Sequence, residues 1–391
     1  MTENNTINQL KNNLLVSLLK DIPADSKICI YGAGKTGLIF KEGIELSRKD
    51  IEIICYIDTY KTENLAGIEV IKVSDLIPLE GKYDFIIIAS AYWNEIEQLL
   101  LKLNIRRYII LDYQKYCLFA DLHFADKSTR NYLMDIKEKE ALTPFFEQTK
   151  NLLFSDEDRK IYNLIVNARL SEENFTDLKI YQSVKLNKNN QYLDFINKKA
   201  IKKVIEAGVC AGNNTVSFLS YFENVEYIYG FEPLYEKFKQ EPFDTIIKKS
   251  DKVSVIQKGL WTNKTQIMFN GWKVTENPDS KISKSSTDLK IDATSIDEFV
   301  KENNIDKIDF VKMDIEGAEM EALKGGKQTI INHRPQLAIS IYHTNKHLYE
   351  IPLYLDSILN NYTYRLEHYT LRQWDTVLYA IPNENYNYSK G

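Results

Sequence analysis

Short apolar runs alternate with longer amphipathic stretches over the first 118 residues of the chain. The apolar runs cover residues 27–31, 51–58, 83–90 and 107–113, and each is about as long as a buried strand. Between the last two runs, apolar residues recur at helical spacing over 93–103. Strands that alternate with helices indicate a parallel α/β sheet, so residues 1–118 are predicted to form a small Rossmann-like domain.

The pattern changes between residues 119 and 190, which are predominantly polar and have few strand-like runs. Helix-start signatures stand at Ser155-Asp-Glu-Asp and Ser171-Glu-Glu-Asn, where a serine precedes acidic residues. We therefore expect residues 119–190 to be a mainly helical connector.

A second α/β alternation fills residues 191–391. Five buried-strand patterns that run into polar ends cover residues 202–208, 225–233, 252–261, 307–317 and 336–343. Two alternating stretches near the end, TYRLEHYT and TVLYAI, suit a final antiparallel pair. The chain as a whole is thus predicted to be an α/β protein, with two Rossmann-like domains joined by the helical connector.

The charge balance and the cysteine spacing argue against several classes of protein. The 50 Lys and Arg residues against 55 Asp and Glu give a formal net charge of −5 at pH 7, whereas a non-specific nucleic-acid binder needs a basic excess. The four cysteines form no C-x-x-C pair, which excludes a zinc ribbon and fits a reducing compartment. No apolar run approaches the ~18 residues of a membrane span, and the polar start is unlike a signal peptide. We expect a cytoplasmic protein without a transmembrane segment, with a homodimer left open.

A glycine-rich turn follows the first predicted strand. Gly32, Gly34 and Gly37 have the G-x-G-x-x-G spacing that opens a helix in dinucleotide-binding domains. Asp58 ends the next predicted strand, where it is placed to accept hydrogen bonds from ribose hydroxyls. The turn therefore predicts a bound ligand, and the alternative is a structural turn whose ligand site is empty or altered. A P-loop is excluded because Cys29 stands where that motif needs its first glycine.

A second glycine-rich turn follows the predicted strand at 202–208. Gly208 and Gly212 have the looser spacing E-x-G-x-x-x-G, which S-adenosylmethionine-dependent methyltransferases use to bring the backbone close to the cofactor. Glu206 stands at the strand end, where it can help to hold the amino-acid end of that cofactor. Glu232 ends the next strand, and its carboxylate is placed to accept from both ribose hydroxyls.

The densest cluster of ionisable residues lies at the end of the predicted strand at 307–317. Its central members are Lys312, Asp314, Glu316 and Glu319. Ligands of open α/β sheets bind at this edge, and charges on a buried strand are costly unless they are paired or functional. The cluster therefore predicts a functional site. The alternative is an internal ion pair between Lys312 and a carboxylate that braces the turn.

Several sequence pieces in the second half of the chain belong together. They are Gln191-Tyr-Leu, EAGVCAGNNT, GFEP, Thr294-Ser-Ile-Asp, DFVKMDIEGAE, ALKGG, PQLAISIYHT, HYT and TVLYA. With these pieces, residues 191–391 resemble the FkbM family of methyltransferases, and K-x-D-x-E-G-x-E is the most specific of them. Members usually carry Asp-x-Gly-Ala in the first turn, where this chain has Glu206-Ala-Gly208-Val209. The front domain resembles, at lower specificity, the nucleotide-sugar-binding domains of sugar-modifying enzymes.

The resemblance implies a class I methyltransferase fold and methyl transfer from S-adenosylmethionine to a sugar hydroxyl of a nucleotide sugar or a surface-polysaccharide precursor. The residues expected to bind the cofactor are Glu206, Gly208, Gly212, Asn213, Thr215, Glu232, Pro233, Trp261 and Asp314. We expect His343, Asp314 and Glu316 to be catalytic, with His343 as the first choice of base because the pKa of a free histidine lies near neutrality. Tyr342 and Lys346 flank this region and are expected to hold the substrate.

The sequence leaves other possibilities open. The side chains able to bind a divalent metal are Asp314, Glu316, Glu319 and His343, although they lack a tight ligand spacing. Trp272, Ser285 and Ser286 are further candidates for contact with the cofactor or the acceptor. Two other functions also stay open. One is a non-catalytic nucleotide-sugar-binding scaffold, and the other is an NAD-dependent sugar-modifying enzyme run by the N-terminal domain.

Overall fold

The computed structural model divides the chain into two compact units. One unit comprises Met1–Thr129 with Lys179–Asn187, and the other comprises Arg130–Leu178 with Lys188–Gly391. The structure describes residues 16–59, 63–79, 81–90, 93–111, 133–134, 136–170, 177–178, 181–182, 191–269, 274–275, 289–370 and 373–386. Trp272, Ser285 and Ser286, which the sequence singles out, lie outside the described residues.

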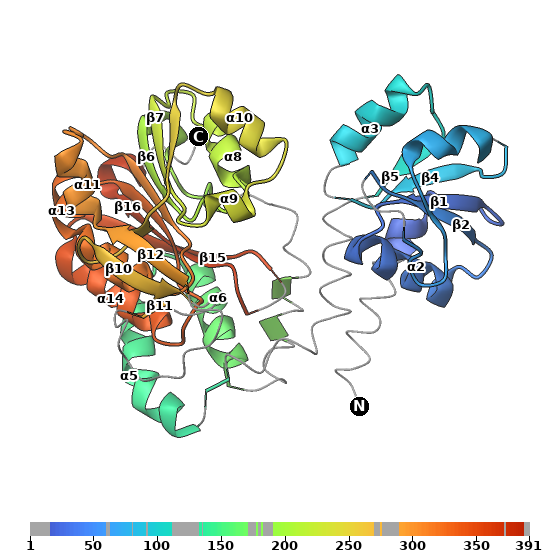
Figure 1. The fold of residues 1–391 in the computed structure, drawn as a ribbon. Coiled ribbons are helices and arrows are strands. Elements are labelled where there is room, and N and C mark those ends of the chain that lie inside the picture. Colours follow the sequence, from blue (N-terminus) through green and yellow to red (C-terminus); the bar gives the residue numbers. More distant parts are fainter. Residues whose placement is uncertain are drawn as a thin grey trace. The chain divides into compact units, whose positions relative to one another are not determined.

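The first unit is built on a five-stranded parallel sheet with the order β3-β2-β1-β4-β5 (Figure 1). Its elements are β1 (Lys27–Tyr31), α2 (Lys35–Ser47), β2 (Glu52–Ile57), β3 (Val70–Ile71), the 3-10 helix η1 (Val73–Leu79), β4 (Phe85–Ile88), α3 (Trp93–Lys102) and β5 (Tyr108–Ile110). Alternate residues of β1 pack in two separate apolar clusters. Ile28 and Ile30 belong to one cluster, and Cys29 and Tyr31 belong to the other. Burial on both faces explains the uninterrupted apolar runs, and the sheet confirms the predicted Rossmann-like fold.

Two helices from the predicted connector, α5 (Ile136–Leu152) and α6 (Asp156–Ala168), belong to the second unit. Ser155 caps α6 by accepting from the backbone N–H of Asp158. The buried Asp158 carboxylate in turn accepts from Arg365 Nε at 2.7 Å, so the start of α6 is fixed to the strand that carries Arg365. These helices therefore pack as part of the second unit. The domain boundaries predicted at 118 and 190 stay predictions.

The second unit is built on a seven-stranded sheet with the order β15-β16-β14-β13-β6-β7-β8. Its strands are β6 (Lys203–Ala207), β7 (Tyr227–Phe231), β8 (Val253–Ile256), β13 (Phe310–Met313), β14 (Gln336–Ser340), β15 (Tyr362–His368) and β16 (Thr376–Pro382). Neighbouring strands are parallel except at β16, which is antiparallel to both β14 and β15. This order with one reversed strand is that of the class I methyltransferase fold and confirms the predicted fold class.

Helices lie on both faces of the seven-stranded sheet (Figure 1). One face carries α8 (Asn213–Tyr221) and α10 (Phe243–Lys249), and the other carries α11 (Ile296–Glu302), α12 (Glu319–Gly325), α13 (Lys327–His333) and α14 (His347–Ile358). A smaller sheet with the order β11-β10-β12-β9 consists of β9 (Gly259–Leu260), β10 (Thr265–Phe269), β11 (Val274–Thr275) and β12 (Leu289–Thr294). Short helices complete the unit: η4 (Lys198–Ala200), α9 (Tyr235–Phe238) and α15 (Asn383–Tyr386).

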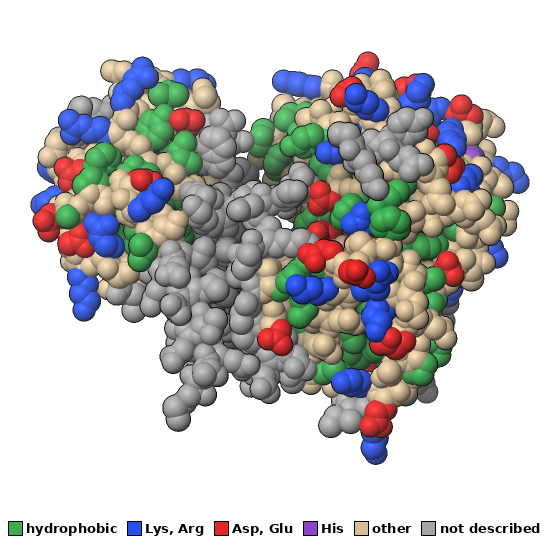
Figure 2. Space-filling view, turned by 180° about the vertical axis from the view of Figure 1, so that it is seen from behind, with side chains coloured by type: hydrophobic (Ala, Val, Ile, Leu, Met, Phe, Trp, Pro, Cys, Tyr) green, Lys and Arg blue, Asp and Glu red, His purple; other side chains and the backbone are tan. Residues whose placement is uncertain are grey.

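Charges of both signs are spread over the described surface. On the face drawn in Figure 2, Lys and Arg side chains are interspersed with Asp and Glu on each unit. In the described part of the chain, none of the helices reaches the length and hydrophobicity of a bilayer-spanning segment.

Candidate active site

A cavity of about 410 Å³ lies at the carboxyl ends of β6, β7 and β13, which are adjacent in the large sheet. Open α/β sheets bind their ligands at this edge, and the volume is within the roughly 300–1,000 Å³ of small-molecule sites. Of the predicted site residues, those that line the cavity are Gly208, Glu232, Pro233, Asp314 and Glu316. Lining residues that sequence reasoning did not single out include Cys210, Asn214, Phe238, Lys258 and Leu260.

The glycine turn after β6 is fixed by packing. Gly208 has φ +83°, and a Cβ at this position would lie 1.9 Å from the carbonyl oxygen of Asp314. Gly212 has φ +96°, and a Cβ there would lie 2.6 Å from Cδ1 of Ile247 on α10. Only glycine fits either place without a shift of the surroundings. Gly208 lines the cavity, whereas Gly212 faces α10.

Val209, where this chain departs from the usual family pattern, is buried inside the fold. A Cβ on Gly230 of β7 would lie 2.7 Å from Val209 Cγ2. The glycine on the neighbouring strand therefore leaves the space that the valine side chain occupies. The bulk of Val209 is accommodated within the sheet region.

Two charged residues lie buried beneath the turn. Glu206 is 0% exposed, and its Oε2 accepts a hydrogen bond of 2.6 Å from the hydroxyl of Thr215 at the start of α8. Burial raises the pKa of Glu206 to about 7, against the opposing effects of Lys312 and Thr215. Lys312 donates from Nζ to the carbonyl oxygens of Ala207 at 3.2 Å and Gly208 at 2.6 Å. Both residues thus support the turn through these hydrogen bonds, and Lys312 also lines the cavity.

Glu232 lines the cavity on the opposite side of the turn from Asp314. Its Oε2 accepts from the backbone N–H of Cys210 at 3.1 Å, and its Oε1 accepts from that of Leu234 at 3.0 Å. These bonds fix the carboxylate at the end of β7. Each oxygen keeps a further lone pair, which is the acceptor capacity that the sequence prediction requires.

Asp314 is held by two tyrosine hydroxyls. Tyr192 donates to its Oδ2 at 2.8 Å, and Tyr342 donates to its Oδ1 at 3.0 Å. Burial raises the pKa of both tyrosines well above the usual range, and the nearby Asp314 carboxylate adds to the effect. The hydroxyls therefore stay protonated and able to donate. The hydroxyl of Tyr342 thus contacts Asp314, and the substrate contact predicted for Tyr342 stays a prediction.

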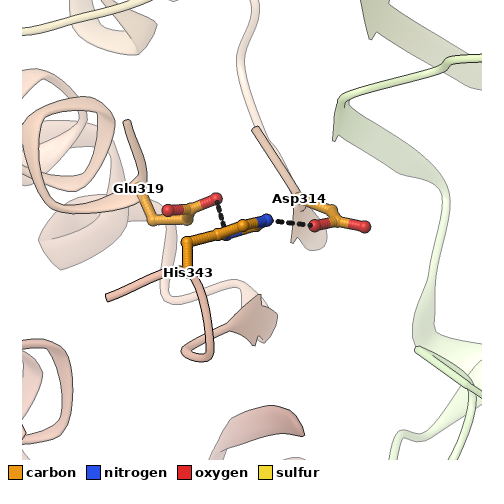
Figure 3. A group of neighbouring side chains, drawn as sticks. All are labelled: Asp314, Glu319 and His343. Carbon is orange, nitrogen blue, oxygen red and sulfur yellow. Dashed lines mark ion pairs between the residues drawn. The ribbon is translucent and has the colours of Figure 1, made fainter. Parts of the chain in front are cut away.

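His343 lies among three carboxylates. Its Nε2 is 3.5 Å from Asp314 Oδ1, and its Nδ1 is 3.0 Å from Glu319 Oε1 (Figure 3). The same Nε2 is also 3.5 Å from Glu316 Oε2. Burial alone lowers the pKa of His343, but Glu319, Asp314 and Glu316 outweigh it and raise the pKa to about 9. The structure thus brings the predicted catalytic residues together, and adds Glu319 to them.

Glu319 is the deepest member of this group. It is 0% exposed, and its Oε1 accepts from the backbone N–H of Ile315 at 2.8 Å. Its Oε2 lies 3.3 Å from His347 Nδ1. Burial would raise the pKa of Glu319, yet His343 and His347 outweigh it and hold the pKa well below its usual range. A buried carboxylate that stays ionised needs positive charge beside it.

Some predicted residues stand away from the cavity wall. Trp261 is 5% exposed and packs in an apolar cluster with Ile267 and Ala318. Lys346 is exposed at the N-cap of α14. Asn213 begins α8, but it is the next residue, Asn214, that lines the cavity. The roles predicted for these three side chains stay predictions.

Arg169 supports the site from a part of the chain that the sequence marks only as a connector. It is fully buried after α6 and donates from Nη2 to the carbonyl oxygens of Tyr342 and Gln373, each at 2.9 Å. Its Nη1 also donates to Asn345 Oδ1 at 3.3 Å. The loop that carries His343 is therefore braced by a side chain distant in the sequence.

The first glycine turn of the chain is held by a side chain that follows β2. Asp58 Oδ2 accepts from the N–H of Ala33 at 2.9 Å. Gly32 has φ +120°, and a Cβ on Gly37 would lie 2.1 Å from the Gly32 carbonyl oxygen. The third glycine thus allows close helix–strand packing, as the motif predicts. In this structure Asp58 braces the turn, and its predicted contact with a ribose stays a prediction.

In comparisons with known proteins, two family models match the chain, one over the five-stranded sheet and the other over most of the seven-stranded sheet. The family described as Methyltransferase FkbM domain matches residues 206–366, and the family described as C2185-like, N-terminal matches residues 24–111. Among curated proteins, the chain is similar to Hexuronic acid methyltransferase AglP of Haloferax volcanii, with 30% identity over 102 residues. That alignment covers 25% of this chain and spans only 40% of the length of the relative.

Solved structures give two further similarities. Methyltransferase FkbM from Methylobacillus flagellatus KT aligns over 97% of this chain and 99% of its own, with 18% identity and a TM-score of 0.47. Precorrin-6y C5,15-methyltransferase from Geobacter metallireducens GS-15 aligns over 48% of this chain and 83% of its own, with 10% identity and a TM-score of 0.29.

Proposed function

Because residues 206–366 form an FkbM-family methyltransferase domain, we propose that this chain transfers the methyl group of S-adenosylmethionine to a sugar hydroxyl. The proposed acceptor is a nucleotide sugar or a surface-polysaccharide precursor. One observation carries the proposal: Glu232 and Asp314 line the same cavity on either side of the glycine turn after β6. The partial similarity to a protein named as a hexuronic acid methyltransferase supports a sugar acceptor.

The residues at the cavity fit S-adenosylmethionine. Gly208 lines the cavity with backbone atoms alone, so the amino-acid part of the cofactor can approach the turn. Glu232 offers a fixed carboxylate for the ribose hydroxyls. Leu260, Ile267 and Ile291 provide an apolar wall that suits the adenine ring.

The chemistry is an in-line displacement. The bound cofactor supplies an electrophilic methyl group on a positively charged sulfur. On transfer the carbon–sulfur bond would break as the carbon–oxygen bond forms, and the proton of the acceptor hydroxyl would pass to one of the carboxylates that line the cavity. The protein therefore has to align the hydroxyl with the methyl group and provide a place for the proton.

Two carboxylates stand where an acceptor hydroxyl can reach them. Asp314 and Glu316 both line the cavity, and their side chains are 26% and 49% exposed. His343 is 6% exposed and lies 3.5 Å from each of them. We assign the contact with the acceptor to Asp314 and Glu316, and a positioning role to His343. The sequence prediction that His343 itself is the base stays a prediction.

The test is methyl transfer to a panel of nucleotide sugars, followed by mass spectrometry of the products. Asp314→Asn should lower turnover at least about 100-fold, since the acceptor loses a charged contact made in the transition state. Glu321→Gln, on α12 but in a surface pair with Lys324, is the matched control and should keep wild-type turnover. Binding of S-adenosylmethionine without any methylated product would instead favour a scaffold. Hydride transfer with NAD would favour the nicotinamide-dependent alternative.

A further inference from the structure

His343 and Glu319 leave buried polar atoms without hydrogen-bond partners. Both ring nitrogens of His343 and the Oε2 atom of Glu319 are enclosed, yet none makes a hydrogen bond with the described residues. The carboxylates nearby lie at ion-pair distance, but they are not aligned with the ring N–H directions. Buried polar atoms in proteins are nearly always satisfied. A partner is therefore missing between these side chains.

We propose that Asp314, Glu319 and His343 bind a divalent metal ion. Each side chain offers one ligand atom, and these atoms all lie within 4.8 Å of one another (Figure 3). Ligands on opposite sides of an ion with bonds of about 2.0–2.2 Å stand about 4 Å apart, so small side-chain adjustments close this set on one ion. Glu316 Oε2, 3.5 Å from His343 Nε2, is placed to become a further ligand.

The charge of the cluster points the same way. Asp314, Glu316 and Glu319 bring three carboxylates to His343, and Glu319 is 0% exposed. An uncompensated buried carboxylate is unfavourable, so positive charge has to enter the cluster. A protonated His343 would supply positive charge, but neither of its ring nitrogens makes a hydrogen bond with a described carboxylate. An ion between the side chains meets both requirements.

The donor set selects the class of metal. Carboxylate oxygens together with one imidazole nitrogen suit Mn²⁺, Fe²⁺ or Zn²⁺, whereas Ca²⁺ prefers a set made only of oxygens. Asp314 also lines the cavity, so the ion would lie next to the acceptor. A bound cation lowers the pKa of a hydroxyl in its coordination sphere. This catalytic use rests on the proposed methyl transfer, whereas the binding of the ion does not.

The test is a titration of the metal-stripped full chain with Mn²⁺, followed by electron paramagnetic resonance of the free ion. Wild-type protein should bind one ion per chain. Asp314→Asn and His343→Gln should each weaken Mn²⁺ binding by at least about tenfold. The half-exposed Glu316→Gln tests the same site without disturbing a buried residue. The controls are Glu384→Gln, a surface partner of Arg334, and His333→Gln, and both should bind Mn²⁺ as the wild type does.

The outcomes separate the site from the reaction. Mn²⁺ binding that is lost in Asp314→Asn, His343→Gln and Glu316→Gln but kept in both controls supports the metal site, even if no acceptor is methylated. Wild-type protein that binds neither Mn²⁺ nor Zn²⁺ more tightly than about 1 mM overturns it, as does binding that the three variants leave unchanged. Full methyl transfer by the stripped protein in the presence of a chelator overturns the catalytic use of the ion.

Discussion

The ε-amino group of Lys312 donates a hydrogen bond of 2.6 Å to the carbonyl oxygen of Gly208. The side chain is 1% exposed, and its Nζ lies 5.0 Å from the centre of the Tyr192 ring. A buried charge is thus balanced by carbonyl dipoles and an aromatic face. Because Lys312 comes from β13 and Gly208 follows β6, this bond joins the two strand ends that shape the cavity.

Lys312→Met should destabilise the second unit by about 2–4 kcal/mol, because it removes a buried cation and leaves carbonyl groups and Glu206 without it. S-adenosylmethionine should also bind more weakly, since the turn at Gly208 loses its support. Urea denaturation and calorimetry measure the two effects. Lys324→Met, which removes a half-exposed lysine, is the control. A variant at position 312 as stable as this control would contradict the argument.

Glu206 should make the fold less stable as the pH rises toward neutrality. Burial raises its pKa in the folded protein to about 7, above the usual value near 4.3 in an unfolded chain. Between these values the folded protein holds a proton that the unfolded chain has released. The contribution of this group to stability is therefore complete below about pH 4, falls through the interval and levels off above about pH 7.

Glu206→Gln removes this titration and isolates it from the other groups. The free energy of unfolding of wild type should fall relative to the variant by on the order of 3 kcal/mol between about pH 4 and 8. Urea denaturation at several pH values measures the difference. Parallel pH profiles of the two proteins would show that the Glu206 carboxyl has an ordinary pKa.

Gly208→Ala should be far more harmful than Gly34→Ala, although both glycines belong to glycine-rich turns. The added methyl group at 208 meets the Asp314 carbonyl oxygen at 1.9 Å, and φ is +83°. At Gly34 a Cβ meets nothing within 4 Å. We expect a loss of more than about 3 kcal/mol or a failure to fold at 208, and a change below about 1 kcal/mol at 34. Thermal unfolding of both variants measures these losses of stability, and equal losses would contradict the packing argument.

The sequence predicts which residues meet at the ends of adjacent strands, but it does not predict contacts that depend on how a helix packs. Asp314 and His343 follow β13 and β14, and neighbouring parallel strands bring their carboxyl ends together, so their proximity can be predicted from pattern alone. The fold class follows from the same alternation. Arg169 carries no comparable signal, because its contacts with the loop at 342–345 depend on where α6 packs. Trp261 packs in an apolar cluster, and its predicted contact with the cofactor stays a prediction, because aromatic residues near a strand end serve either purpose.

Tyr192→Phe and Tyr342→Phe should each lower the turnover by about tenfold or more, because each removes a hydrogen bond that holds the Asp314 side chain. Both hydroxyls hold the same carboxylate, so the double variant should not show the product of the two losses. Tyr364→Phe is the control, since the Tyr364 hydroxyl is buried without a hydrogen-bond partner in the described structure. It should keep full turnover and full stability. Unchanged turnover in both single variants would show that the reaction does not need the two hydroxyls to hold Asp314.

Asp58→Ala should weaken the first unit whether or not a ligand binds there. The Asp58 carboxylate accepts from the N–H of Ala33 at 2.9 Å, so its removal should cost about 1 kcal/mol of stability. Hydrogen–deuterium exchange of the turn at 32–37 should become faster in this variant. Asp58→Asn keeps an acceptor oxygen and should restore slow exchange. If Asp58 only binds a ribose, the turn at 32–37 should exchange at the same rate in the wild type and in both variants when no ligand is bound. Only nucleotide binding should then differ between the three proteins.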